Sequence, residues 1–183
     1  ESGGSINVVG KGFGAGAGPG GGSDGSGGGY GGGGSYGGNG AKGQSDNGLF
    51  LRTYGSLLYP VDLGSGGSTS SGSAGLGGGS IILNISGKLI NNGTITSSAQ
   101  DASTQGGGGS GGSVYIIANS IEGIGNISAN GSSTRNSLSG SGGGGRIAIY
   151  YSTSSYNGVI NVAAGSGGNA VPEAGTIVLV KQN

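Results

Sequence analysis

The sequence predicts an all-β fold: a parallel β-helix-like solenoid with coils of about 33 residues and packed, polyglycine-II-like glycine segments. Glycine occupies 53 of the 183 positions, against a usual share of roughly 7 %. A strand-like motif also recurs at nearly constant spacing, with aliphatic residues at the same places in each copy, which is typical of stacked repeats. A β-sandwich covered by polyglycine II helices is the alternative, because the repeat alone does not separate the two.

The chain opens on a strand-like run, "SINVV" at residues 5–9, and passes into a glycine-rich arm, residues 10–47. Its first part, "GKGFGAGAGPGGGSDGSGGGYGGGGSYGGNG", has the composition of a flexible linker. Extended glycine helices with three residues per turn can, however, pack side by side and hydrogen-bond through their backbones. We therefore predict that this arm forms a packed wall of the domain.

An aromatic insertion, "GLFLRTYGSLLYPVDLG" at residues 48–64, interrupts the repeat. It holds Phe50, Tyr54 and Tyr59, and Pro60 ends any strand there because proline lacks the donor that a ladder needs. We predict that it covers one face of the repeats.

Regular strand repeats occupy residues 77–181 and complete a single domain, residues 1–183. The equivalent positions Ser80, Ser113, Arg146 and Thr176 are 33, 33 and 30 residues apart. A shorter second strand follows each of the first three copies, and "SIN" near the start fits the same pattern. Alternate residues of a strand face opposite sides, so aligned aliphatic columns predict the buried face. The columns are Ile81, Val114, Ile147 and Ile177; Leu83, Ile116, Ile149 and Leu179; and Ile6, Ile95, Ile127 and Ile160.

The charge distribution excludes several classes of partner. Seven basic and seven acidic side chains cancel and are scattered singly, so no basic patch for nucleic acid or anionic lipid is expected. No apolar run approaches the roughly 18 residues of a membrane span. Low charge with abundant glycine, serine, threonine and asparagine suits an extracellular or cell-surface protein.

The sequence gives no indication of an enzyme. Histidine and cysteine are absent, which removes the commonest general base and thiolate chemistry. The carboxylates fall in different parts of the repeat, so no acid–base pair is expected; they are Asp62, Asp101, Glu122 and Glu173. "GSGGGG" at 140–145 leads into a strand rather than a helix, and "PGGGSD" at 19–24 is an isolated, imperfect calcium-turn pattern. We expect no catalytic residue, no metal and no cofactor.

Asparagine and tyrosine supply the remaining candidate sites. The glycosylation motif N-x-[ST] occurs at Asn84, Asn92, Asn126 and Asn130. Asn92, Asn126 and Asn157 could alternatively form an asparagine ladder between coils. Partly exposed tyrosines stack on sugars or on neighbouring subunits, and we select Tyr150 and Tyr156 as candidate contacts of that kind.

The chain resembles glycine-rich, β-helix-like repeat modules of very large secreted or surface proteins of bacteria and some unicellular eukaryotes. The motifs "GKG" with "GPG", "YGS", "GGSVYI", "GNISANG", "GGGGRIAIYY" and "AGTIVL" carry the resemblance and occur in order along nearly the whole chain. Such modules look structural or adhesive, so the resemblance implies no active site to carry over.

These observations lead us to expect a secreted structural protein that assembles head-to-tail with copies of itself into an extracellular filament, sheath or matrix. The candidate assembly residues are Ser5, Ile6, Val8, Ile177 and Leu179, because they belong to strands at the two ends of the repeat, where edges stay unpaired. The alternative is a glycan-binding adhesin or stalk module whose partner is a cell-surface glycan.

Overall fold

The computed structural model describes residues 3–24, 29–44, 52–69, 73–103 and 105–183. Within these ranges the regular structure is entirely β, and no helix occurs. The eight strands are β1 (Ser5–Asn7), β2 (Ser80–Ile90), β3 (Thr94–Thr96), β4 (Ser113–Gly123), β5 (Asn126–Ser128), β6 (Arg146–Tyr156), β7 (Val159–Asn161) and β8 (Thr176–Lys181).

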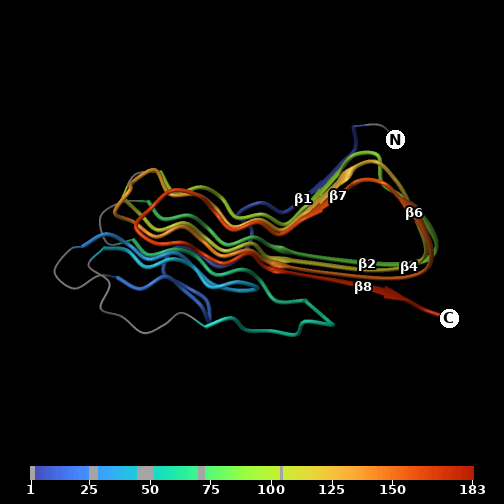
Figure 1. Cartoon of the computed structure of the whole chain (residues 1–183), viewed down its shortest axis with the longest axis horizontal. Coiled ribbons are helices and arrows are strands. Elements are labelled where there is room, and N and C mark those ends of the chain that lie inside the picture. Colours follow the sequence, from blue (N-terminus) through green and yellow to red (C-terminus); the bar gives the residue numbers. More distant parts are fainter. Residues whose placement is uncertain (1–2, 25–28, 45–51, 70–72, 104) are drawn as a thin grey trace.

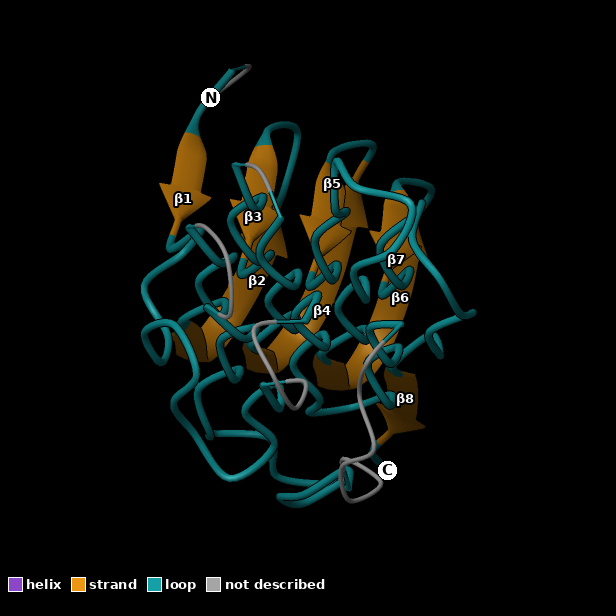
Figure 2. Cartoon of the chain, turned by 90° about the vertical axis from the view of Figure 1, so that its left-hand side faces the viewer, coloured by secondary structure: helices purple, strands orange, loops and turns teal. Residues whose placement is uncertain are grey.

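The strands form two parallel, four-stranded sheets. The short strands make sheet A, in the order β1-β3-β5-β7, and the longer strands make sheet B, in the order β2-β4-β6-β8. Each coil takes one strand from sheet B, then one from sheet A, and returns through a glycine-rich arm (Figure 1, Figure 2). The predicted solenoid with coils of about 33 residues is thus confirmed.

The strand registers match the aliphatic columns read from the sequence. In sheet B, Ile81 pairs with Val114, which pairs with Ile147. In sheet A, the isoleucines of β1, β3, β5 and β7 stand opposite one another. These columns form one hydrophobic core between the two sheets. Parallel stacking therefore repeats the same small set of inward side chains in every coil.

The long strands of sheet B extend further than the sequence predicts. The repeated motifs "GGGSIILNIS" at 77–86, "SGGSVYIIANS" at 110–120 and "GGGGRIAIYYS" at 142–152 predict strands that end near residues 86, 120 and 152, whereas β2, β4 and β6 end at 90, 123 and 156. They curve toward sheet A (Figure 1), and the β2–β4 register shifts between Ile85 and Lys88. Ser86 and Gly87 lie at this shift, where an extra residue bends the strand without ending its pairing.

The glycine arms pack against one another through backbone hydrogen bonds in many directions. The arm at residues 107–112 bonds to the segments near residues 34, 66, 76, 97, 132 and 141. A strand in a sheet has neighbours on two sides only, whereas extended helices with three residues per turn direct their amides all round the axis. The arms therefore form a bundle rather than a third sheet.

The long arm near the N-terminus belongs to this bundle. Gly12 donates to Gly77 O at 2.7 Å, and Gly34 donates to Gly108 O at 2.8 Å. Residues 31–38 are all buried. Residues 31–38 therefore belong to a packed wall, as predicted from the glycine content, whereas residues 14–17 of the same arm are exposed; residues 25–28 and 45–47 lie outside the described residues.

The aromatic insertion lies against the outer face of sheet B. Tyr150 on β6 donates its hydroxyl to Leu58 O at 3.0 Å, and the ring of Tyr59 lies beside those of Tyr115 and Tyr150. The insertion covers this face only in part, because Ile82 on β2 stays exposed. Phe50 lies outside the described residues.

Candidate functional site at the two ends of the stack

The stack of coils ends in two incomplete coils. β1 lies one level before the coil of β2 and β3, and no described strand of sheet B stands at its level. β8 lies one level beyond the coil of β6 and β7, and there the described residues supply no strand of sheet A. Figure 2 shows β1 and β8 at opposite edges of the molecule. Each end is therefore half a coil, and the two halves are of opposite kinds.

The inward aliphatic residues lose their cover at these ends. Ile6 on β1 is 42 % exposed, whereas Ile95, its neighbour in the same column, is 3 % exposed. At the other end, Ile177 and Leu179 on β8 are 41 % and 52 % exposed. Their counterparts on β6, Ile147 and Ile149, are 0 % and 1 % exposed. The core columns thus open to solvent at both ends of the stack.

A hollow lies at each end where the missing half-coil would go. At the β1 end it is lined by residues 4–6 and 89–95. The β8 end has an apolar hollow lined by Ile121, Ile149, Tyr151, Ser154, Tyr156, Ile160 and Leu179. The β8 hollow suits apolar side chains, whereas the lining of the β1 hollow is mixed, with isoleucine and leucine beside asparagine, serine and threonine.

The predicted assembly residues divide into free and engaged ones. Ser5 and Ile6 lie on β1 and Ile177 and Leu179 on β8, each strand with one edge that no described strand pairs. Val8 lies just beyond β1, where its amide donates to Thr96 O and its carbonyl accepts from Gly79 N. Val8 is thus held within its own chain.

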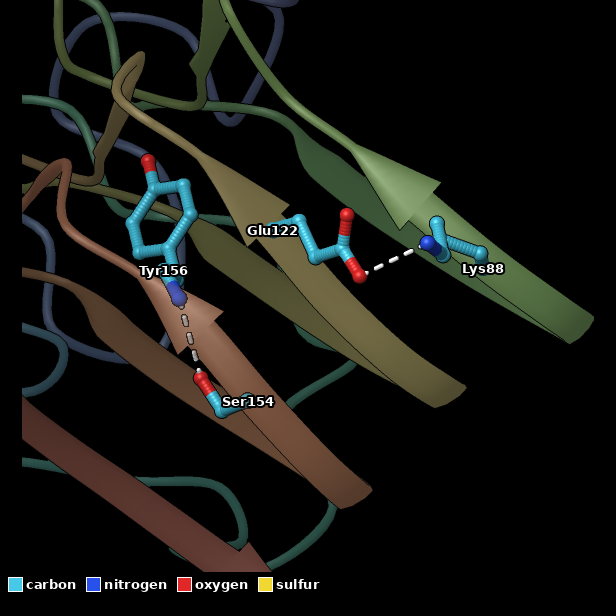
Figure 3. Close-up of polar contacts among 4 residues, drawn as sticks. All are labelled: Lys88, Glu122, Ser154 and Tyr156. Carbon is cyan, nitrogen blue, oxygen red and sulfur yellow. Dashed lines mark hydrogen bonds and ion pairs between the residues drawn. The ribbon is translucent and has the colours of Figure 1, made fainter.

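The two tyrosines selected from the sequence are not brought together. They stand six positions apart on β6, which is about 20 Å along a strand. The Tyr156 ring packs against the core, and its hydroxyl donates to Gly125 O at 2.8 Å and accepts from Asn91 Nδ2 at 3.1 Å. Its amide bonds to Ser154 Oγ (Figure 3). Tyr156 is therefore a structural residue at the rim of the β8 hollow.

Tyr150 instead belongs to an outward-facing aromatic cluster with Tyr59 and Tyr115. The rings of Tyr59 and Tyr150 are nearly parallel, with centroids 6.2 Å apart, and Tyr115 stands edge-on to both. Burial and the neighbouring phenols raise the pKa of Tyr115. Alternation along β4 and β6 puts Tyr115 and Tyr150 on one face of sheet B, but no local sequence signal brings Tyr59 from the insertion to them.

A polar cluster that the sequence did not reveal anchors the insertion and the long glycine arm to sheet B. Arg146 is buried; its Nε donates to Tyr54 O at 3.0 Å, and its guanidinium lies 5.4 Å from the centroid of the Tyr36 ring. Tyr36 hydrogen-bonds Ser113, and Tyr54 donates to Leu63 O. Burial raises the pKa of Tyr54 to about 12 and also raises the pKa of Tyr36.

The asparagines of the glycosylation motifs differ in exposure. Asn84 on β2 and Asn92 at the β2–β3 turn are exposed, whereas Asn126 and Asn130 are half-buried. The asparagine ladder is not formed, because Asn126 pairs with Thr94 and Val159 rather than with another asparagine. Asn92 Oδ1 instead accepts from Ile124 N in the next coil.

The acidic side chains serve separate local contacts. Glu122 forms an ion pair of 2.7 Å with Lys88 on the neighbouring strand (Figure 3). Glu173 accepts from Asn39, and Asp24 accepts from Ser68. Within the described ranges, no three acidic side chains gather into a group that could hold a metal ion.

Comparisons with known proteins add no relative. Neither the family models, nor the curated proteins, nor the solved structures gave a match to this chain. In the part of the chain that the structure describes, no helix has the length and apolar character needed to cross a membrane.

Proposed function

We propose that the protein is an extracellular structural subunit that assembles head-to-tail into a filament, sheath or matrix. The observation that carries this proposal is the exposure of the core columns at both ends, at Ile6, Ile177 and Leu179. Interior coils bury the same columns almost completely. A second copy stacked on either end would continue the arrangement that already exists within the chain.

Apolar burial and edge hydrogen bonds would both contribute to such stacking. Fully burying an aliphatic side chain contributes about 1.5–3 kcal/mol, so three half-exposed residues contribute about 2–4 kcal/mol together. Free strand edges add backbone hydrogen bonds of about 0.5–1.5 kcal/mol each. The formal net charge of zero does not oppose close association. Contacts between different ends of a molecule are heterologous, so they extend without closing on themselves.

This role requires neither catalysis nor a cofactor. The acidic side chains are dispersed among the arms, the insertion and sheet B, and a stacking contact uses only apolar side chains and strand edges. We therefore propose that the protein is not an enzyme, and that its partners are copies of itself.

An acidic side chain introduced at the β8 end of the stack tests the proposal, because a buried charge would prevent a second copy from stacking there. We expect wild-type protein at near-physiological salt to form filaments in electron microscopy, and Leu179→Asp to remain dispersed. The matched control is Ile124→Asp, because Ile124 is 74 % exposed but lies in an interior coil. Circular dichroism establishes that both variants stay folded. Filaments of Leu179→Asp as abundant as those of wild type would contradict end-to-end assembly.

A second candidate function is recognition of a cell-surface glycan by the outer aromatic cluster. Tyr59 is 57 % exposed and lies beside Tyr115 and Tyr150, and exposed tyrosine rings offer an apolar face with a polar tip to a sugar. Glycan-array binding that is lost in Tyr59→Ala but kept in Tyr156→Phe would support this role. Absence of saturable binding by the wild-type protein would exclude it.

A further inference from the structure

We propose that two adjoining copies share one coil, with β8 of one copy as its sheet-B strand and β1 of the next copy as its sheet-A strand. This inference rests on the proposed head-to-tail assembly and specifies its joint. Only this superposition gives both half-coils their missing strand without leaving an empty level. β8 would then pair with β2 of the next copy, and β7 would pair with β1 of the next copy.

The core columns match across this joint. Within the shared coil, Ile177 and Leu179 of one copy face Ile6 of the next, as Ile147 and Ile149 face the sheet-A isoleucines inside the core cluster. Ile6 of the next copy extends the column that ends at Ile160. It therefore enters the apolar hollow that Ile160, Leu179 and Tyr156 line. The three core-column residues that the free ends expose, Ile6, Ile177 and Leu179, become covered.

The shared coil fixes the axial repeat of the filament. Each copy adds four strands to each sheet, and adjacent strands lie about 4.8 Å apart, so the subunit repeat is about 19 Å along the stack. A joint without coil sharing adds a further level and lengthens the repeat to about 24 Å. Helical reconstruction from electron micrographs separates these values.

Cysteine pairs test the register directly, because the natural chain contains no cysteine. In the shared coil, Val178 lies opposite Ile82 of the next copy on the outer face, since Val178 continues the column of Ile82, Tyr115 and Ala148. Strands about 4.8 Å apart suit a disulfide. Within one chain the two positions lie three strand spacings apart, about 14 Å, so any disulfide between them joins two copies.

The matched control shifts the register by two residues on the same face. Mild oxidation of assembled Ile82→Cys/Val178→Cys protein should give a ladder of covalent oligomers on a non-reducing gel. Asn84→Cys/Val178→Cys protein should give few covalent oligomers, because the Cα atoms of positions 84 and 178 in adjoining copies lie about 8 Å apart, too far for a disulfide.

Filaments that show neither the covalent ladder nor the 19 Å repeat would overturn the shared coil while leaving head-to-tail assembly intact. A wild-type chain that stays monomeric would overturn both proposals. Equal ladders from the two cysteine pairs would also contradict the proposed register.

Discussion

Substitution of Gly75 tests whether the glycine arms are a close-packed part of the fold. An alanine Cβ at this buried position would lie 2.5 Å from Gly109 N, 2.6 Å from Gln100 O and 2.7 Å from Ser132 Oγ. These atoms belong to different segments of the bundle, so the methyl group cannot move away from one without approaching another.

The expected cost follows from these contacts. Overpacking of this kind costs about 1–3 kcal/mol. The displaced atoms take part in hydrogen bonds such as Gly109 N to Ser132 Oγ at 2.8 Å, and loss of one or two adds about 0.5–1.5 kcal/mol each. Alanine also lowers the conformational entropy of the unfolded chain, which stabilises the folded state by about 0.4–1 kcal/mol and offsets part of this cost. We expect Gly75→Ala to lower the free energy of unfolding by about 2–4 kcal/mol, taking these terms together.

Denaturant unfolding followed by circular dichroism measures this difference. The matched control is Gly14→Ala in the long arm, where an added Cβ meets nothing within 4 Å. The control should unfold at or slightly above the wild-type midpoint. Equal midpoints for Gly75→Ala and Gly14→Ala would refute the packed bundle and leave the arms as loosely held loops.

Two further predictions concern the polar cluster beneath the insertion. Replacing Arg146 by lysine should lower the free energy of unfolding by about 1–3 kcal/mol, because an ammonium group cannot reproduce the planar fork of donors. Denaturant unfolding measures this loss, with Arg135→Lys as the control because Arg135 is exposed. Equal stabilities of the two variants would contradict the role of Arg146 in anchoring the insertion. The pKa of Tyr54 rises from 10.0 to about 12 on folding, so its neutral form is favoured in the folded state. Its contribution to stability is complete below pH 10 and is lost as the pH rises toward 12. Unfolding of wild type and Tyr54→Phe between pH 9 and 12 should show a smaller alkaline loss in the variant, and parallel curves would contradict this.

The sequence predicted the parts of the fold that repeat. The buried columns that contain Ile81, Leu83 and Ile95 could be predicted because each coil places the same type of residue on the same face. Alternation along each strand decides which face that is. Contacts that occur in only one coil could not be predicted, because they leave no repeated pattern in the sequence. Arg146 occupies a column otherwise held by serine and threonine, and its partners Tyr36 and Tyr54 approach from segments far away in the sequence.

The candidate assembly site was predicted only in part. Strand positions near both termini identified Ile6 and Ile177, and the repeat indicated a second-strand motif at the start and a first-strand motif at the end. Which strands share a level, and therefore which strand each end lacks, follows only from the paired order of the two sheets. Asn126 shows the same dependence, since it stands two positions away from the level of Asn92 and Asn157, and this offset removes the ladder.

The many-sided bonding of the glycine arms gives this region an unusual mechanical character. A sheet can be unzipped by peeling away one edge strand at a time, because its bonds lie in a single plane. The arm at residues 107–112 has bonded neighbours all round its axis, so a pull from any direction loads several rows of bonds together. Amide hydrogens there should exchange as slowly as those of a core, although loops elsewhere exchange quickly. We therefore expect the bundle to resist shear mainly through its backbone bonds, with a few serine hydroxyls such as that of Ser132 adding to them.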